Sequence, residues 1–392
     1  MNSDEWKKLK VEDVAEVVGG GTPSTSNSDY WGDEIPWLTP RDLSNYPERF
    51  IAKGERSISK KGLQNSSARL IPKGSVLLTS RAPIGYLAIA KNEVCTNQGF
   101  KSFVVDENKA HNEFVFYLLK HNVELLKSLG TGTTFAEISA TTLRNLEFEF
   151  PPLPTQRRIA GILSALDEKI ELNRQTNATL EAMGQSIFRE WFLDNEDVVN
   201  WDVVPLPEII NLNLTRTLKK GSIAPYLDMA NMPTQGHRAI EWRDRPFGSG
   251  TKFVNGDTLL ARITPCLENG KTAFVDFLED GQVGWGSTEY IVFSPKPPLP
   301  PEYGYYLART EEVRNHAIQN MIGTSGRQRA SASCFDSFMI SVPPAELAAR
   351  FGEVARSLMA EIKANDEESR TLASIREVLL PKLMNGEFDL EE

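Results

Sequence analysis

The chain carries nearly the same pattern twice, and this repetition limits what it can fold into. From Trp6 to Trp191, and again from Trp201 to Leu383, an irregular block runs into a Pro-Pro pair and then into a long amphipathic segment. The pairs are Pro151-Pro152 and Pro343-Pro344, 192 positions apart, and beyond them the two copies superpose without gaps. A duplication of this length predicts an object with two equal parts related by a two-fold axis.

Both segments that follow the Pro-Pro pairs are predicted to be long helices. We expect the run Pro151–Pro154 to exclude helix, Thr155 to be the N-cap, and the first helix to end near Phe192. Pro381 is expected to end or kink the second helix. Apolar residues recur at spacings of three and four, which predicts a coiled-coil seam. The matching seam positions are Ile159, Ile162, Leu166, Ile170, Leu180, Met183 and Ile187 in the first helix and Phe351, Val354, Leu358, Ile362, Leu372, Ile375 and Leu379 in the second.

A polar residue interrupts each seam at the same place. Asn173 and Asn365 correspond, and they should face each other if a perpendicular two-fold axis makes the helices antiparallel. A buried Asn pair would fix the register, because sliding by a heptad places amides opposite hydrocarbon. The alternative is that both amides are solvated edge positions. Helices of about 35 residues would span about 50 Å and act as a spacer between two domains.

The blocks between the helices have the composition of short strands broken by turns. Gly, Pro, Asn and Ser interrupt apolar runs such as Ser75–Thr79, Phe100–Val105 and Tyr290–Phe293, and helical stretches are expected at Glu113–Leu129 and Glu302–Met321. We predict an α+β fold with curled, mostly antiparallel sheets. The predicted division is a globular domain at 1–150, a spacer helix at 151–195, a second globular domain at 196–342, and a second helix with a C-terminal tail at 343–392.

The two globular blocks share a frame but differ in the polar residues that the frame carries. Ile35–Arg41 matches Ala224–Ala230, Gly74–Pro83 matches Gly256–Pro265, and the loop Gly130–Thr134 matches Gly323–Arg327. Within the first match, Thr39 corresponds to Asp228. Equal frames with unequal loops predict two binding domains with unlike ligands.

The loop residues are of the types that read base edges and hold phosphates in DNA. Each residue alone is more often an ordinary turn or surface residue, but recurrence at matching places favours a common role for the set. In the first block the candidates are Thr22, Ser24, Thr39, Arg41, Ser80, Arg81, Thr96, Asn97, Gln98, Lys101, Thr131, Thr133 and Thr134. In the second block they are Asp228, Asn231, Arg262, Thr264, Ser287, Thr288, Glu289, Arg327 and Arg329.

The net charge of −10 argues against DNA binding only until its distribution is considered. Lys+Arg stands against Asp+Glu as 18 against 19 in residues 1–150 and as 14 against 15 in residues 201–342. The helical segments are more acidic, with 5 against 8 in 151–200 and 6 against 11 in 343–392. The acidity therefore sits on the helices, and a nearly neutral domain can still present a basic face, although the count does not demonstrate one.

The sequence lacks the usual motifs of catalysis and cofactor binding. It contains no Gly-x-x-x-x-Gly-Lys-[Ser/Thr] phosphate loop, no Asn/Asp-Pro-Pro-aromatic methyltransferase motif and no paired histidines with metal-ligand spacing. Cys95, Cys266 and Cys334 are scattered, which predicts buried free thiols rather than disulfides or a zinc site. No apolar run approaches the roughly 18 residues of a membrane span. We therefore expect a cytoplasmic protein with no metal and no catalytic activity of its own.

Several long motifs occur in a characteristic order along both halves. They are Gly20–Ser24, Tyr30-Trp31, Ile35–Pro40, Ser80–Gly85, Pro151–Ile159, Leu166–Ile170, Leu259–Lys271, Gly323–Arg327 and Leu380–Gly386. With these motifs, the chain resembles the specificity (S) subunit of type I restriction-modification systems over essentially its full length.

The resemblance implies two target-recognition domains separated by two antiparallel spacer helices. Each domain would read one half of a split DNA sequence, and the helices would set the gap between the halves. The implied partners are double-stranded DNA, two modification subunits that carry S-adenosylmethionine and methylate adenine, and restriction subunits that use ATP and Mg. These cofactors would belong to the partners and none to this chain. One departure is that the second helix begins Pro343–Leu347 without the Thr-Gln-Arg-Arg sequence of the first.

Two alternatives stay open on the sequence alone. In the closer one, cleavage and methylation share a single partner chain, and copurification of one or two partners would separate the cases. The other is a duplicated adaptor that binds proteins rather than DNA and shows no salt-dependent DNA affinity. For the S-subunit interpretation, helices of about 50 Å limit half-site centres to about 15 base pairs apart. Inserting four residues near Thr179 should then lengthen the tolerated gap.

Overall fold

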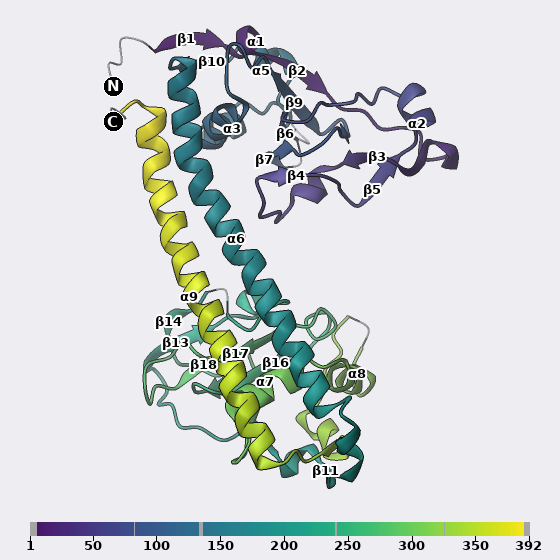
Figure 1. The fold of residues 1–392 in the computed structure, drawn as a ribbon, viewed down its shortest axis with the longest axis vertical. Coiled ribbons are helices and arrows are strands. Elements are labelled where there is room, and N and C mark those ends of the chain that lie inside the picture. The colour runs from purple at the N-terminus through teal and green to yellow at the C-terminus, as the bar shows by residue number, and fades with distance from the viewer. Residues whose placement is uncertain (1–5, 82, 133–135, 240, 325, 388–392) are drawn as a thin grey trace. The chain divides into compact units, whose positions relative to one another are not determined.

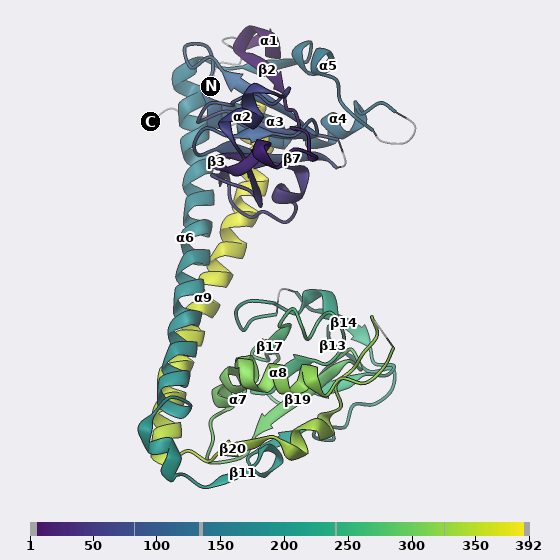
Figure 2. The ribbon, with the colours of Figure 1, turned by 90° about the vertical axis from the view of Figure 1, so that its right-hand side faces the viewer.

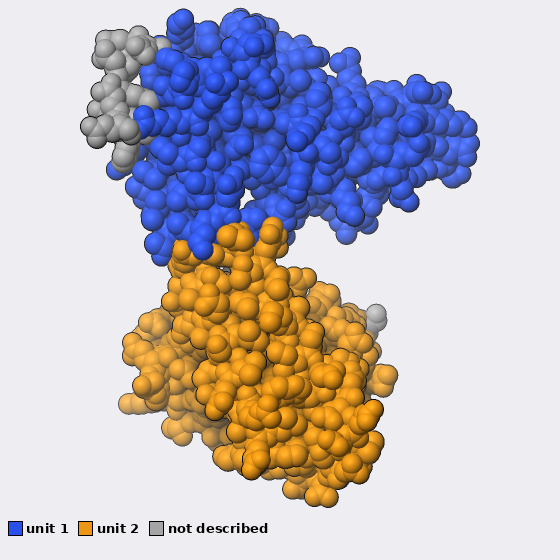
Figure 3. Space-filling view, in the orientation of Figure 1, with its two compact units in different colours: residues 1–171, 369–392 blue, residues 172–368 orange. Residues whose placement is uncertain are grey.

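The computed structural model describes residues 6–81, 83–132, 136–239, 241–324 and 326–387 (Figure 1). The chain forms two compact units: unit 1 contains residues 1–171 and 369–392, and unit 2 contains residues 172–368 (Figure 3). Each unit mixes helices and sheets, as an α+β fold predicts. Among the described residues, no helix is long and apolar enough to cross a membrane.

Two helices of 40 residues each pass through both units, α6 (Leu153–Phe192) and α9 (Ala345–Met384). The prediction that Pro154 excludes helix and that Thr155 is the N-cap is wrong. Pro154 lies in the first turn of α6, where a missing N–H costs nothing, and the backbone N–H of Gln156 donates to the Pro152 carbonyl at 3.0 Å.

Pro381 was expected to end or kink the second helix, and the first of these two expectations is wrong. Pro381 lies inside α9, which continues to Met384, and the Asn385 N–H donates to the Pro381 carbonyl at 3.0 Å. So close to the C-terminus, one lost donor and one crowded carbonyl are tolerated, since only one more turn follows.

Unit 1 contains three sheets, with strand orders β2-β9-β6-β7-β4, β5-β3-β8 and β1-β10. Pairing is antiparallel except between β4 and β7 and between β3 and β8. The strands are β1 (Lys7–Lys10), β2 (Ala15–Gly19), β3 (Trp31–Leu38), β4 (Phe50–Ile51), β5 (Arg56–Ile58), β6 (Val76–Ser80), β7 (Ile84–Ala90), β8 (Cys95–Thr96), β9 (Phe100–Val105) and β10 (Glu147–Phe150). The helices are α1 (Val11–Val14), α2 (Lys60–Gln64), α3 (Asn112–His121), α4 (Val123–Ser128) and α5 (Ala140–Arg144).

The core of unit 1 lies where α3 and α6 pack together against the five-stranded sheet. Phe114 and Leu118 of α3 share one apolar cluster with Val76 of β6 and with Ile159 and Leu163 of α6. The stretch predicted as one helix at Glu113–Leu129 divides into α3 and α4 at Asn122. Apolar seam residues of α6 are thus used to anchor the helix to the globular part of the same unit.

Unit 2 contains sheets with strand orders β12-β19-β16-β17, β14-β13-β18-β15 and β11-β20. Only the β13–β18 pair is parallel among its described strands. The strands are β11 (Val203–Pro205), β12 (Ile210–Leu212), β13 (Ile223–Leu227), β14 (Arg243–Pro246), β15 (Thr251–Phe253), β16 (Thr258–Ala261), β17 (Thr272–Phe274), β18 (Gly284–Gly286), β19 (Tyr290–Pro295) and β20 (Met339–Ser341). The helices α7 (Pro301–Arg309) and α8 (Glu311–Gln319) replace the single helical stretch predicted there, and α7 packs on β16, β17 and β19 (Figure 2).

Burial distinguishes the three cysteines, all of which are free thiols. Cys95 is buried, as predicted, whereas Cys266 and Cys334 are only half-buried. Burial raises the pKa of the Cys95 thiol to about 11, and burial with the nearby Asp336 does the same for Cys334. Both therefore stay protonated at neutral pH, which makes them poor nucleophiles.

In unit 2, a polar layer joins the two long helices. Asn173 of α6 is 2% exposed and Asn365 of α9 is 9% exposed. The Asn173 amide donates to the Asn365 carbonyl oxygen at 3.3 Å, and the Asn365 amide donates to Asn177 Oδ1 at 2.9 Å. Asn177 in turn donates to Asp366 Oδ1 at 2.8 Å and Asn173 to Glu368 Oε2 at 2.7 Å. Both central amides are buried, and these four bonds all cross from one helix to the other.

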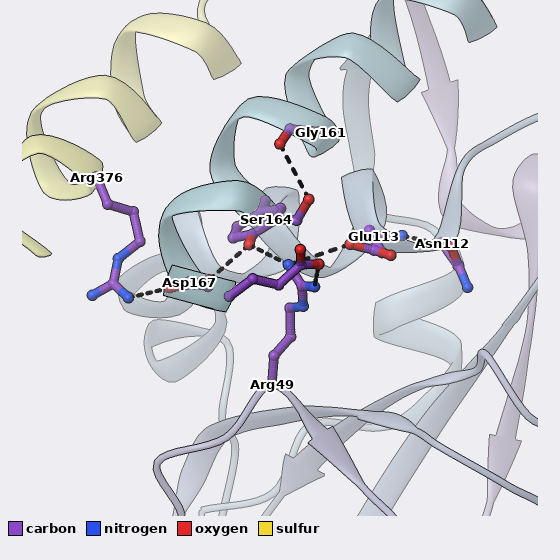
Figure 4. Close-up of polar contacts among 9 residues, drawn as sticks. Arg49, Asn112, Glu113, Gly161, Ser164, Asp167 and Arg376 are labelled. Atoms are coloured by element: carbon purple, nitrogen blue, oxygen red, sulfur yellow. Dashed lines mark hydrogen bonds and ion pairs between the residues drawn. The ribbon is translucent and has the colours of Figure 1, made fainter. Parts of the chain in front are cut away.

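In unit 1, the helices and the globular part are joined by a charged network (Figure 4). Asp167 of α6 accepts hydrogen bonds from Arg376 of α9 and, at 2.6 Å, from the Tyr117 hydroxyl of α3. Arg49 donates to the same hydroxyl at 2.9 Å and to Glu168 at 2.9 Å. Burial alone would raise the pKa of Asp167, but the charge of Lys120 and the bonds from Tyr117 and Arg376 lower it below its ordinary value.

We predict that Asp167→Asn lowers the free energy of unfolding of unit 1 by about 2–3 kcal/mol at pH 7, because it leaves Arg376 without its buried counter-charge. Glu168→Gln is the matched control, since Glu168 is 69% exposed and its pair should contribute less than about 1 kcal/mol. Urea unfolding measures both.

The effect should also depend on pH. Folding lowers the pKa of Asp167, so its contribution is complete above the unfolded value of about 3.9 and is lost as the pH falls through the folded pKa. The wild type and Asp167→Asn should therefore converge in strongly acidic urea titrations. A pH-independent difference would contradict this assignment.

Candidate nucleic-acid interface

The polar loops of unit 1 meet at one end of its five-stranded sheet. β2 ends with Gly19 opposite Lys101, near the start of β9, and β6 ends with Ser80 opposite Ile84, where β7 begins. Since neighbouring strands run antiparallel, these ends and starts lie at the same edge. At this edge Gly20 passes so close to the next loop that a Cβ would lie 2.1 Å from the Asn97 carbonyl oxygen, which only glycine permits.

The three-stranded sheet brings further candidates to the same place. β3 and β8 are parallel, and the Asn97 N–H donates to the Leu38 carbonyl at 2.8 Å, so that the turn from Thr39 to Arg41 lies beside residues 96–98. The Thr22 hydroxyl, on the loop after β2, donates to Gln98 Oε1, on the loop after β8, at 2.5 Å. Loops far apart in the sequence therefore form one polar surface.

Some of the candidate residues hold this surface together. Thr39 donates from its N–H and its hydroxyl to Asp42 Oδ2, both at 2.7 Å, and Asn97 Oδ1 accepts the Gly99 N–H at 2.9 Å. Ser80 and Thr96 are fully buried, and we assign them a supporting role. Ser24, Arg41, Gln98 and Thr131 are exposed and can reach a ligand. Thr133 and Thr134 lie outside the described residues.

A carboxylate between two cations occupies this edge of unit 1. Glu137 lies 3.1 Å from Lys101 Nζ and 3.7 Å from an Arg81 guanidinium nitrogen. Lys101 also donates to the Ser80 hydroxyl at 3.4 Å. Glu137 was missed by the sequence reasoning, although it closes the Gly130–Thr134 loop that was singled out.

In unit 2, the candidates also gather at strand ends. β16 ends with Ala261 opposite Tyr290, the first residue of β19, while Leu227 at the end of β13 pairs with Gly286 of β18. The Tyr290 hydroxyl donates to the Leu227 carbonyl at 3.1 Å and ties the two sheets together there. The loops that begin at Asp228, Arg262 and Ser287 consequently lie close to one another.

Supporting and accessible residues can be separated here too. Asp228 Oδ1 accepts the Ala230 N–H at 3.1 Å as an N-cap, and the Ser287 hydroxyl accepts the Glu289 N–H at 3.1 Å. The Thr264 N–H donates to the Gln328 carbonyl at 3.0 Å. Thr288 and Arg327 are exposed, and Asn231 is half-buried. Lys271, which was not singled out as a site residue, donates from Nζ to the Met229 carbonyl at 2.7 Å and holds the 228–231 turn.

In the charged cluster of unit 2, the loop supplies a cation, Arg329, whereas the loop of unit 1 supplies the carboxylate, Glu137. Glu289, just before β19, accepts from Arg329 Nε at 2.7 Å and lies 3.8 Å from Arg262 Nε. Arg329 also donates to the Arg327 carbonyl at 3.2 Å. This cluster, like that of unit 1, contains one carboxylate and two cations.

The backbone beneath the two clusters is the same. In unit 1 the Ser80 N–H donates to the Gly99 carbonyl at 2.7 Å, the Ile138 N–H donates to the Ser80 carbonyl at 3.0 Å, and Thr131 and Glu137 exchange backbone hydrogen bonds. In unit 2 the Arg262 N–H donates to the Glu289 carbonyl at 3.0 Å, the Ala330 N–H donates to the Arg262 carbonyl at 2.9 Å, and Ile322 and Arg329 exchange backbone hydrogen bonds.

These bonds define which positions correspond. Ser80 corresponds to Arg262, Gly99 to Glu289, and Glu137 to Arg329. Thr131 corresponds to Ile322, so the predicted match of Gly130 with Gly323 is wrong by two residues at the start of this loop. The sequence match aligned glycines, whereas the backbone bridge lies one residue away from each of them, on opposite sides.

The arrangement suits the reading of hydrogen-bond patterns more than bond-making. Half-exposed carboxylates accept hydrogen bonds, and guanidinium groups donate two in parallel. In the described residues, no group of three or more His, Cys, Asp or Glu side chains could hold a metal ion.

Known proteins are similar to this chain in sequence and in fold. The sequence pattern of the family described as "Type I restriction modification DNA specificity domain" matches residues 3–182. The MjaIX specificity subunit of a type I restriction enzyme from Methanocaldococcus jannaschii is 31% identical over 419 aligned residues, which cover 99% of this chain and 94% of that protein. The HindI specificity subunit from Haemophilus influenzae is 33% identical over 179 residues, covering 44% of this chain and 38% of that one.

Among solved structures, the S subunit of a type I restriction-modification system from M. genitalium has the same fold, with a TM-score of 0.60 and 16% identity, and the alignment covers 96% of each chain. Since a relative above 30% identity spans nearly the whole sequence, the chain belongs to the family of type I restriction enzyme specificity subunits.

Proposed function

We propose that this chain reads a bipartite DNA target, with one half-site for each unit. The observation that carries the proposal is the matched backbone frame, in which the positions of Ser80, Gly99 and Glu137 in unit 1 are held by Arg262, Glu289 and Arg329 in unit 2. One frame with two different sets of donors and acceptors is what two recognition modules for different base sequences require.

The proposed domains are those expected from the sequence. Residues 1–150 and 196–342 are the two target-recognition domains, and 151–195 and 343–392 are the helical segments. Similar strand orders, β2-β9-β6-β7 and β12-β19-β16-β17, support an origin by internal duplication.

The proposed readout is direct, through the exposed loop residues. Side chains such as Gln98, Thr288 and Arg327 would reach base edges or phosphates, while the buried members of the set fix the loops that carry them. Because phosphate contacts release counterions, binding should weaken as salt increases.

The long helices would set the gap between the half-sites. α6 is continuous through the boundary between the units at residues 171 and 172. A 40-residue helix spans about 60 Å at 1.5 Å per residue. The buried layer of Asn173, Asn177 and Asn365 would fix the register of the predicted coiled coil, since a slipped alignment would leave these amides among apolar side chains.

The proposed partners are modification subunits, with two copies expected, and ATP-dependent restriction subunits. S-adenosylmethionine, ATP and Mg would be bound by those partners.

The starts of the two long helices differ in structure, because the second lacks the Thr-Gln-Arg-Arg sequence of the first. Gln156 of α6 is buried, accepts the His111 N–H at 2.9 Å and donates to the Pro151 carbonyl at 2.9 Å, whereas the matching position in α9 holds buried Ala348. The two helix starts are thus anchored differently, and the partners need not dock on them equivalently.

A single partner chain that combines methylation and cleavage is the second candidate. The names of the relatives, which are subunits of type I restriction enzymes, favour separate partners. Copurification that yields one partner chain carrying both activities would favour this second candidate.

We predict that Arg262→Ala alters recognition only in the half-site read by unit 2, because Arg262 belongs to that unit alone. Discrimination at one base pair should fall about tenfold or more, as expected for one lost bidentate contact. Sequencing of duplexes bound by the complex with its modification subunit measures the change. Arg81→Ala is the matched control and should affect only the other half-site. Equal weakening on all sequences would reduce Arg262 to a phosphate contact.

We predict that lengthening both helices at the unit boundary widens the gap. Four residues inserted after Glu171 and four after Glu368 add one turn where α6 and α9 pass from one unit to the other. This place is preferable to Thr179, because nearby Glu181 is bonded to Tyr305 of the globular part.

The selected gap should grow by up to about two base pairs, from about 6 Å of added helix, while both half-sites stay unchanged. A duplex series with fixed half-sites and varied spacing provides the measurement. An unchanged optimum would contradict the spacer role, and so would altered half-sites.

A further inference from the structure

Glu137 and Arg329 occupy the same backbone position in the two units, at the edge where the polar loops meet. Both side chains are accessible, at 38% and 42% exposure, and yet both are held by neighbours. A position that is fixed in space, open to solvent and opposite in charge between the two frames is suited to determine which base is accepted.

Arg329 has donors to spare in a fixed orientation. A guanidinium group carries five N–H donors. Glu289 takes the Nε donor at 2.7 Å, and the Arg327 carbonyl takes one from Nη1 at 3.2 Å. The remaining donors are enough for a parallel pair of hydrogen bonds to O6 and N7 of a guanine, the commonest specific contact of arginine in the major groove.

Glu137 presents the complementary chemistry. Its two oxygens lie near Lys101 and Arg81, so the carboxylate keeps lone pairs for a further donor. The amino group of cytosine is the base donor that Glu accepts in the major groove.

The surrounding charges make a carboxylate tolerable beside DNA. Two cations and one carboxylate give Arg81, Lys101 and Glu137 a net charge of +1, and Arg262, Arg329 and Glu289 sum to the same value. Without its two cations, Glu137 would be repelled by the phosphates. Both clusters are therefore compatible with a polyanion while they present opposite hydrogen-bonding groups.

We propose that this position determines specificity in each half-site: Arg329, braced by Glu289, reads a guanine in the half-site of unit 2, and Glu137, braced by Lys101 and Arg81, reads a cytosine in the half-site of unit 1. The inference rests on the proposed function, since it assigns bases to the interfaces proposed above.

The test uses the full chain in complex with its copurified modification subunit and a pool of random duplexes. The Arg329→Ala variant should lose about tenfold or more preference for one G·C pair in one half-site. The Glu137→Gln variant should lose preference for one G·C pair in the other half-site, because the amide can rotate to donate as well as accept. Gln319→Ala, at an exposed position of α8 outside the proposed interface, is the control and should keep both preferences.

Arg329→Lys separates base reading from charge. It keeps the positive charge but cannot form the parallel pair of bonds, so the base preference should be lost while the salt dependence of binding stays as in the wild type. Thermal unfolding of each variant within the complex identifies a loss caused by misfolding, and Arg329→Lys and Glu137→Gln preserve size well enough to remain informative.

The outcomes distinguish this inference from the function on which it rests. A wild-type complex that selects no split motif contradicts the proposed function itself. If the wild type selects a split motif and the folded Arg329 and Glu137 variants keep the same base preferences, the inference alone is overturned. A loss of affinity that is equal for all four bases at the position overturns it as well.

Discussion

The backbone hydrogen bonds of Ser80 with Gly99 and Ile138 tie three separate segments of unit 1 together at one end of a sheet, and those of Arg262 with Glu289 and Ala330 do the same in unit 2. Buried backbone groups must be paired, so these bonds persist whatever side chains the positions carry. The frame can therefore stay constant while the groups that it presents change from a serine to an arginine, or from a glutamate to an arginine. A recognition domain that diversifies its target without refolding needs this separation between frame and presented groups.

The contacts between the two long helices give up some stability in exchange for a defined alignment of one helix on the other. In unit 2 the buried layer around Asn173 and Asn365 gives up apolar contact, and in return it makes hydrogen bonds from Asn173, Asn177 and Asn365 that cross to the other helix. In unit 1 the corresponding link is ionic, from Asp167 to Arg376, and it extends through Tyr117 to Arg49. The link in unit 1 also attaches the helices to the globular part, and in unit 2 the Tyr305 hydroxyl does so by donating to Glu181 of α6. Directional contacts of this kind suit the proposed spacer of defined length.

Much of the fold could be predicted because its signals are local or periodic. Spacings of three and four gave both long helices, and apolar runs bounded by Gly and Pro gave β6, β9 and β19 nearly at their observed limits. The errors occurred where the position of a residue within its helix, rather than its type, decides its effect. Pro154 and Pro381 lie near helix ends, where the cost of proline is small, and residue type alone does not show how near an end a proline is.

The sequence indicated which loops lie together at the candidate site better than it indicated which side chains contact one another there. The loops were found because they recur, but Glu137 was missed since a lone glutamate in a DNA-reading loop has no recognisable pattern until Arg81 and Lys101 are seen beside it. The match of the 130–134 loop failed because a bridge between Thr131 and Glu137, rather than the glycines, fixes its position. Which of the exposed residues touch bases stays a prediction, since it depends on the DNA as much as on the chain.

In the proposed function, two unlike interfaces held by one helical spacer read one split target. Its most direct measurement is the selection of bound duplexes from a random pool by the wild-type chain with its modification subunit, followed by sequencing. We predict two short, different motifs separated by a fixed number of unspecified base pairs. A single continuous motif, or two motifs at freely varying distance, would contradict it.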